Sequence, residues 1–145
     1  KDQGRYSEAI RTLQQAIDIL NNNYQPLKSI SPLNNLGLVY TEIDDYKHAE
    51  ECFKRAIKIH KDHIGESDRT MATYYNNLGL LYTEIGKYHE AEIYILKTEQ
   101  IFRQLLGEKH PDYAVVINNL ALLYQKMDEY NQAEQRFLQV LDIFK

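Results

Sequence analysis

Residues 76–82 read Asn-Asn-Leu-Gly-Leu-Leu-Tyr, and two near-copies of this phrase lie forty-two residues before and after it. The earlier copy, at residues 34–40, reads Asn-Asn-Leu-Gly-Leu-Val-Tyr, and the later copy, at residues 118–124, reads Asn-Asn-Leu-Ala-Leu-Leu-Tyr. A constant period of this length is typical of stacked supersecondary units, each too small to bury its own apolar face. The spacing predicts a repeat architecture rather than a single closed core.

A second motif, a tyrosine followed three residues later by an alanine, recurs along the chain. Its copies are Tyr6 with Ala9, Tyr46 with Ala49, Tyr88 with Ala91, and Tyr130 with Ala133. A turn-forming residue precedes each tyrosine: Gly4, Asp44, Gly86 and Asp128. Such residues tolerate the bends that end helices. Each full unit is therefore predicted to be two antiparallel helices joined by about three residues.

The third unit shows the expected helix boundaries. Ser67 is predicted to cap a helix that Asp68 opens, and Gly86 is predicted to end it. A second helix is predicted from Lys87 to residues 106–107, because its apolar residues recur at three- and four-residue steps. We expect the two helices to cross closely at their small residues, Gly79 and Ala91. The units then occupy about 1–24 (a half repeat), 31–64, 67–107 and 110–145, within one all-α domain of residues 1–145.

Two prolines set the expected starts of other helices. Pro111 suits the first helical position, where the missing N–H would be unpaired anyway, and His110 is expected to cap that helix. Pro32 falls where the other units are already inside a helix. An interior proline costs about 3 kcal/mol, so we expect this helix to begin late, with Ser31 as N-cap and residues 24–30 as a loop.

Composition excludes several function classes. The net charge is −4 and basic residues are scattered, which does not favour nucleic acid or an anionic membrane as partner. No run of about 18 apolar residues is present, so we expect no membrane span. The single cysteine, Cys52, excludes an internal disulfide and favours a reducing, cytoplasmic location. It is expected to be a packed residue rather than a reactive thiol.

No catalytic or cofactor-binding pattern is found. There is no phosphate-binding glycine loop and no nucleophile elbow, so we expect neither enzyme activity nor a cofactor. His60 and His63 lack further ligands at metal spacing and are expected to be solvated near a helix end. His48 and His89 are expected to face water. The twelve tyrosines are expected mostly in the core rather than in base stacking.

The combined pattern Leu-Gly-x-x-Tyr, then Gly/Asp-x-Tyr-x-x-Ala, resembles the tetratricopeptide repeat (TPR) over nearly the whole chain. The period, the Asn-Asn phrase and residues 106–111 (Leu-Gly-Glu-Lys-His-Pro) resemble the long-repeat branch typified by kinesin light chains. The departures are Thr98 and Val140, where alanine is usual, and residues 64–68, which lack the His-Pro pair. The resemblance implies a right-handed αα-superhelix, a TPR solenoid, of about three and a half repeats. The chain would be a fragment of a longer protein.

The resemblance also implies a partner-binding groove lined by the first helix of each unit. The family's groove positions map onto nine residues here: Asn34, Leu38, Thr41, Asn76, Leu80, Thr83, Asn118, Leu122 and Gln125. None is basic, so a clamp for a C-terminal carboxylate is not expected. The asparagines could pair with a peptide backbone above an apolar floor of leucines. Alternatively, the second asparagines, Asn35, Asn77 and Asn119, are structural and the first ones carry no ligand.

Three functions follow from this pattern as hypotheses. The leading one is a non-catalytic module that binds a peptide segment or a partner helix in a neutral groove lined by Asn and Leu. The second is scaffolding or self-association, including a homo-oligomer formed through open repeat ends. The third, by analogy with fusions of the long-repeat branch, is regulation of a larger multidomain enzyme or transcription regulator.

Overall fold

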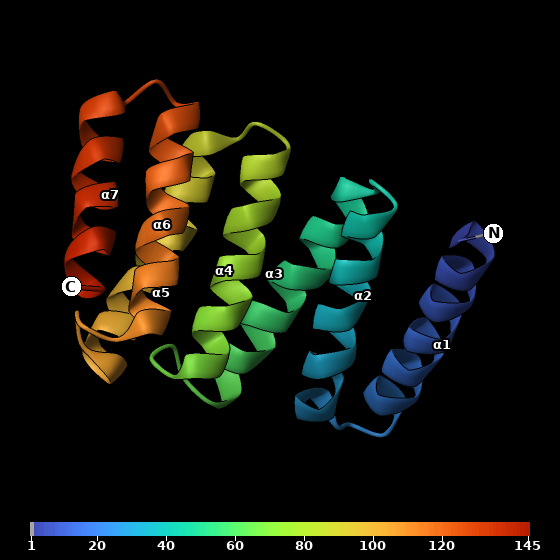
Figure 1. The fold of residues 1–145 in the computed structure, drawn as a ribbon. Coiled ribbons are helices and arrows are strands. Elements are labelled where there is room, and N and C mark those ends of the chain that lie inside the picture. The colour runs from blue at the N-terminus through green and yellow to red at the C-terminus, as the bar shows by residue number, and fades with distance from the viewer. Residues whose placement is uncertain (1) are drawn as a thin grey trace. The chain divides into compact units, whose positions relative to one another are not determined.

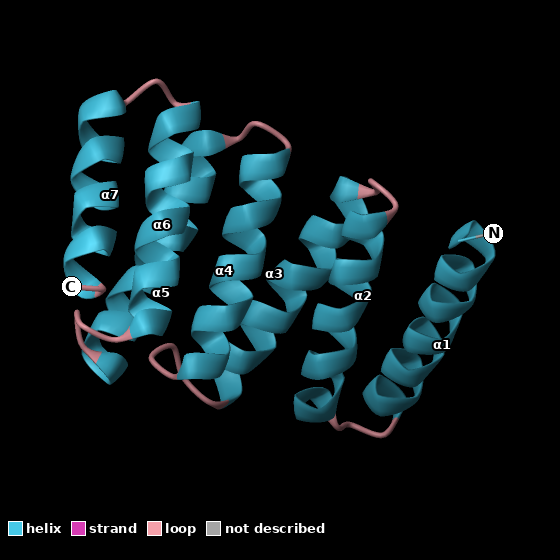
Figure 2. Ribbon diagram, viewed as in Figure 1, coloured by secondary structure: helices cyan, strands magenta, loops and turns pink. Residues whose placement is uncertain are grey.

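Every regular element in the described part of the chain, residues 2–145, is a helix (Figures 1 and 2). The computed structural model contains seven α-helices and one short 3-10 helix within that range. Their bounds are α1 Asp2–Asn22, η1 Pro26–Ser29, α2 Ile30–Glu42, α3 Tyr46–His63, α4 Arg69–Glu84, α5 Tyr88–Leu106, α6 Pro111–Lys126 and α7 Tyr130–Ile143. The all-α prediction is confirmed.

The helices form two compact units, which are described separately. The first ends at Glu66 and contains α1, η1, α2 and α3, with α2 packed on both α1 and α3. The second spans Ser67–Lys145 and contains two hairpins, α4 with α5 and α6 with α7, joined by packing of α5 on α6. Each hairpin corresponds to one predicted repeat.

The three hairpin turns share one backbone conformation. Asp44, Gly86 and Asp128 all have positive φ angles, of 62°, 82° and 62°. The N–H of the following residue donates to the carbonyl of the tyrosine that ends each Asn-Asn phrase, as in Lys87 to Tyr82 at 2.8 Å. This bond is the Schellman closure of a helix end. The predicted bends at these three residues are confirmed, whereas Gly4 lies inside α1.

Equivalent leucines form the centre of each hairpin. Leu36, Leu78 and Leu120 are at most 1% exposed, so all three are buried, as the repeat requires. The predicted close crossing at Gly79 is confirmed, because a Cβ there would lie 2.6 Å from Cγ1 of Ile95 and 3.4 Å from the Ala91 carbonyl oxygen. The missing side chain lets α4 and α5 approach.

The predicted start of the first helix in the second repeat, residues 31–64, is wrong. Residues 26–29 form η1 rather than a loop, and α2 begins at Ile30 with Ser29, not Ser31, at its N-cap. Pro32 therefore occupies the third helical position. That position is still in the first turn, where backbone N–H groups have no partner within the helix, so proline is tolerated. The Ser29 hydroxyl donates to the Pro26 carbonyl at 2.6 Å and closes η1.

The N-cap of α4 also differs from the prediction. Asp68, not Ser67, is the capping residue, with an extended backbone conformation. Its carboxylate accepts a hydrogen bond of 2.8 Å from the Met71 N–H. Both residue types are good caps, but α4 begins at Arg69, which places Asp68 rather than Ser67 at the cap position. At α6, His110 is the cap and Pro111 the first residue, as predicted.

Four of the five histidines are either clearly exposed or clearly buried. His48, His63 and His89 are exposed, as predicted. His60 is only 3% exposed, so the prediction that it is solvated is wrong. It continues the buried stripe of Ala49, Phe53 and Ala56 on α3, at steps of four, three and four residues. If the helical spacing of the buried residues is continued beyond Ala56, it reaches His60, so the sequence could have predicted that this histidine is buried.

Candidate partner-binding face

The first helix of each hairpin presents the same type of face. Leu38 on α2, Leu80 on α4 and Leu122 on α6 are each 43% exposed, although they are large apolar side chains. Each lies four residues after the first asparagine of its phrase, so leucine and asparagine share one side of the helix. The structure thus gives all three predicted leucines the same half-exposed environment.

The asparagines of this face are half-buried, not fully solvated. Asn34, Asn76 and Asn118 all have intermediate exposure. The Oδ1 atom of Asn76 is buried, and no hydrogen-bond donor of the described residues reaches it. A buried acceptor without a donor is unfavourable, because it has lost water and gained nothing in return. Asn76 therefore carries an unused acceptor beside an exposed leucine.

The threonines of the face are already hydrogen-bonded within their own helices. The Thr41 hydroxyl donates to the Gly37 carbonyl at 2.9 Å, and the Thr83 hydroxyl donates to the Gly79 carbonyl at 3.0 Å. The fourth repeat has the exposed Gln125 instead. Because both hydroxyl protons are used, Thr41 and Thr83 can offer an outside group only acceptor lone pairs.

On α6 the apolar face is longer than the mapped positions indicate. Val115 is 59% exposed and lies seven residues before Leu122, which is two helical turns away on the same side. Its counterparts are Ser31 on α2 and Thr73 on α4, both exposed. Val115 lies three residues before Asn118, so the same helical spacing, applied one step earlier in the sequence, would have identified it.

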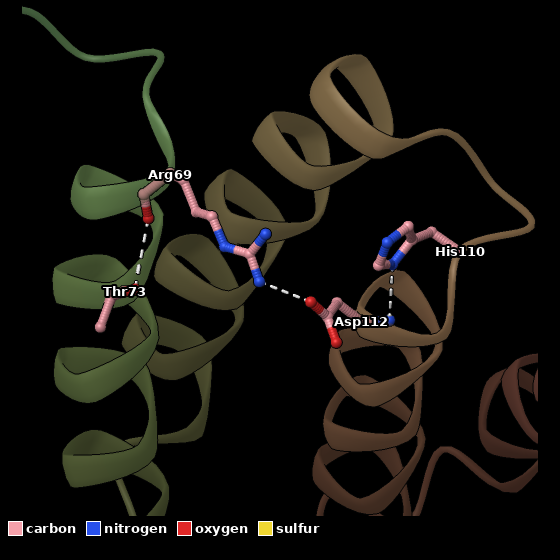
Figure 3. Close-up of polar contacts among 4 residues, drawn as sticks. All are labelled: Arg69, Thr73, His110 and Asp112. Carbon is pink, nitrogen blue, oxygen red and sulfur yellow. Dashed lines mark hydrogen bonds and ion pairs between the residues drawn. The ribbon is translucent and has the colours of Figure 1, made fainter.

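An ion pair joins the first turns of α4 and α6 within the second unit (Figure 3). The Arg69 guanidinium donates to the Asp112 carboxylate at 2.5 Å. The same guanidinium lies 5.7 Å from the ring centroid of Phe102 on α5. Asp112 is itself held by its backbone N–H, which donates to Nδ1 of His110 at 3.0 Å (Figure 3). These contacts connect the starts of the two helices that carry Leu80 and Leu122.

The described residues offer neither a metal site nor a reactive thiol. Among residues 2–145 no cluster of three His, Cys, Asp or Glu side chains could hold a metal ion. Cys52 is 6% exposed, and burial raises the pKa of its thiol to about 11. A thiol that stays protonated is a poor nucleophile, which agrees with the predicted packing role. None of the described helices is both long and apolar enough to cross a bilayer.

A family model described as Tetratricopeptide repeat matches residues 1–62 and 70–145. The chain belongs to the tetratricopeptide repeat family. A curated relative, the human Tetratricopeptide repeat protein 29, is 38% identical over 56 residues, which are 39% of this chain and 12% of that protein. The match therefore covers only a small part of that relative.

Solved structures show the same fold. BtubC (BKLC) from P. vanneervenii has a TM-score of 0.89 at 24% identity, over 97% of this chain and 57% of that one. A putative kinesin light chain from P. anserina with nearly identical TPR-like repeats has a TM-score of 0.82 at 20% identity, over 97% and 68%. MamA has a TM-score of 0.70 at 22% identity, over 98% and 70%. The predicted likeness to kinesin light chain repeats is confirmed at the level of fold.

Membership of this family gives the chain a general function class. TPR repeats generally mediate protein–protein interaction, so a protein or peptide is the expected kind of partner. The family and its kinesin light chain-like members are typically non-catalytic. The nine mapped residues go beyond that class and stay a prediction.

Proposed function

We propose that this chain is a non-catalytic module that binds an extended peptide segment or a partner helix along the exposed faces of its first helices. The observation that carries the proposal is the equal 43% exposure of Leu38, Leu80 and Leu122. Large apolar side chains held half out of a helix at equivalent places favour burial by a partner, at about 25 cal/mol per Å² removed from water.

The neighbouring asparagines supply the polar part of the proposed recognition. A carboxamide has two donors and one acceptor, which can pair with a peptide backbone whatever its side chains. The buried Oδ1 of Asn76 has no donor among the described residues, so turning this carboxamide toward a peptide N–H would break no existing hydrogen bond of the oxygen. No basic residue is among the nine positions, so the proposed contacts are backbone hydrogen bonds and apolar packing.

The second unit allows a matched test. Peptides are selected from a random-sequence display library against the whole chain, and their affinities are measured for two double variants. N76A with N118A, and L80S with L122S, are each expected to weaken binding about tenfold or more, since central contacts dominate such interfaces. The control is I93S with L105S, because these side chains are 54% and 52% exposed on α5, away from the proposed face.

Two outcomes contradict this assignment. Unchanged affinity in both face variants would exclude the face, and equal loss in the α5 control would move the binding surface to the second helices. Folding is checked by circular dichroism for each variant. All the substituted positions are at least partly exposed, so the fold is expected to persist.

A second candidate, self-association, is favoured by one observation on the last turns of α7 and on its C-cap, Phe144. Leu138, Leu141 and Phe144 are 56%, 64% and 65% exposed and recur at three-residue steps. Such a stripe is suited to burial against another helix. If copies associate through it, light scattering across a concentration series will show a rising mass that L141E abolishes. A constant monomer mass would exclude this function.

A further inference from the structure

The connection between α1 and α2 forms a surface pocket of about 430 Å³ in the first unit. Its lining residues come from the loop, from η1 and from the end of α3: Tyr24, Gln25, Pro26, Leu27, Lys28 and His63. The volume lies within the range of about 300–1,000 Å³ that is usual for ligand sites. None of the six residues belongs to the face on α2, α4 and α6.

The backbone around this pocket is fixed by local hydrogen bonds. Tyr24 has a φ angle of 54°, which is uncommon for a residue with a Cβ. Its N–H donates to the Asn21 carbonyl at 3.1 Å, and the Gln25 N–H donates to the Leu20 carbonyl at 2.9 Å. In η1, which follows the loop, the Ser29 hydroxyl donates a hydrogen bond to the Pro26 carbonyl. Local hydrogen bonds therefore fix the backbone around the pocket, both where the loop leaves α1 and where it enters η1.

The lining combines exposed apolar groups with cationic and donor groups. Tyr24 is 92% exposed and Leu27 is 47% exposed. Lys28 carries a positive charge, His63 offers an imidazole, and no carboxylate of the described residues lines the pocket. The acidic residues closest in sequence to His63 form ion pairs with lysines outside the pocket. The first of them, Asp62, pairs with Lys58 at 3.3 Å.

Glu66, the next acidic residue along the chain, pairs with Lys61 at 3.4 Å. Neither Lys28 nor His63 forms an ion pair with a carboxylate of the described residues, so the Lys28 charge is available. The whole chain has a net charge of −4, whereas the lining of this pocket has, among the described residues, one lysine and no carboxylate.

We propose that this pocket is a second binding site, for a peptide segment with an Asp or Glu directly beside an aromatic or large aliphatic residue. The carboxylate would pair with the Lys28 ammonium, with the His63 imidazole as a further donor. The adjacent apolar side chain would lie between Tyr24 and Leu27. Neither contact alone gives appreciable affinity in an open pocket, but the two together select an acidic–apolar pair.

The test uses two capped dipeptides of nearly equal shape, acetyl-Asp-Phe-amide and acetyl-Asn-Phe-amide, titrated into the whole chain. Amide chemical shifts are followed by heteronuclear NMR. We expect the aspartyl probe to shift the amide signals of Tyr24, Gln25, Leu27, Lys28 and His63 with a millimolar Kd. The asparaginyl probe, which lacks the charge, is expected to bind about fivefold more weakly, as the loss of one partly exposed ion pair requires.

Variants assign the recognition to particular side chains. K28Q should remove the difference between the two probes, whereas K47Q, a change at an exposed lysine outside the pocket, should leave it unchanged. L27S should weaken both probes together. Equal binding of the two probes to the unmodified chain, shifts centred outside this loop, or an undiminished preference in K28Q would each overturn the proposal. Because no residue of the α2, α4 and α6 faces is involved, the result is independent of the function proposed above.

Discussion

The hydroxyl of Tyr113 on α6 donates a 2.6 Å hydrogen bond to Oε2 of Glu99 on α5, where both side chains are buried. Glu99 is 6% exposed, and Arg103 reaches the same oxygen at 3.5 Å. Burial raises the pKa of Tyr113, and the bonded carboxylate raises it further, so the phenol remains a donor. The pair satisfies a carboxylate that burial would otherwise penalise.

Removal of this donor should destabilise the second unit. In Y113F the Glu99 carboxylate keeps its burial but loses its shortest hydrogen bond, and the free energy of unfolding should fall by about 1–3 kcal/mol. Denaturant unfolding followed by circular dichroism measures this loss.

A matched control exists for that substitution. Tyr130 donates a hydrogen bond to Asp128 at 2.9 Å in an exposed turn. Y130F removes the same kind of bond to a carboxylate, but water replaces it, so no measurable change in stability is expected. Equal effects of Y113F and Y130F would contradict the importance of burial.

Two glycine-to-alanine changes should act in opposite directions. In G79A the new Cβ would meet Ile95 Cγ1 at 2.6 Å, and the overpacked crossing should cost about 1–3 kcal/mol. In G4A the position is helical and nothing lies within 4 Å, so alanine should stabilise by up to about 1 kcal/mol. Thermal denaturation of the two variants measures both effects, and a loss of stability in G4A would show that its surroundings are not open.

The start of α4 can be tested by a pair of neighbouring substitutions. D68A removes the bond from Asp68 to the Met71 N–H and should cost about 1 kcal/mol, as the loss of an N-cap usually does. S67A should have little effect, because Asp68 is the cap. If S67A were the more harmful change, the serine cap predicted from the sequence would be right and the observed one wrong.

Cys52 should be unreactive in the folded chain at pH 8. Its pKa of about 11 is raised mainly by burial, so almost no thiolate is present. A disulfide reagent such as dithiobis-nitrobenzoate should react slowly with native protein and rapidly in guanidinium. Fast native labelling would contradict the burial of the thiol.

The same raised pKa predicts how stability depends on pH. The folded state favours the protonated thiol, so this contribution is complete below about pH 9, the unfolded value, and is lost as pH rises through about 11. Tyr124, whose burial raises its pKa to about 12, acts in the same direction. The free energy of unfolding should therefore fall from about pH 9 upward, with C52A showing a smaller fall than the unmodified chain.

The repeat, its hairpins and its turns were predictable because they depend on periodicity. Helical steps of three and four residues locate α4 and α5, and a bend recurs before each tyrosine. The connection between α1 and α2 was not predictable from periodicity. It has no counterpart in the other units, so neither η1 nor the helical place of Pro32 could be inferred by comparison within the chain.

Buried polar residues were harder to locate than apolar ones. Glu99 and His60 occupy inward positions where most repeats use apolar side chains, and only the identity of a distant partner such as Tyr113 explains the carboxylate. Thr98, where alanine was expected, is fully buried and donates to the Tyr94 carbonyl at 3.0 Å. On the candidate face, the spacing of the sequence predicted the positions of the leucines. The unused acceptor of Asn76 could be recognised only from the structure.

The shared left-handed bend at residues 44, 86 and 128 has a consequence for evolution. Aspartate occupies two of these sites and glycine the third, so what the three sites share is the left-handed path of the main chain. A saturation library should accept Gly, Asn and Asp at these sites and reject valine or isoleucine. That narrow tolerance would provide a fingerprint with which diverged copies of the hairpin could be recognised in longer polypeptides.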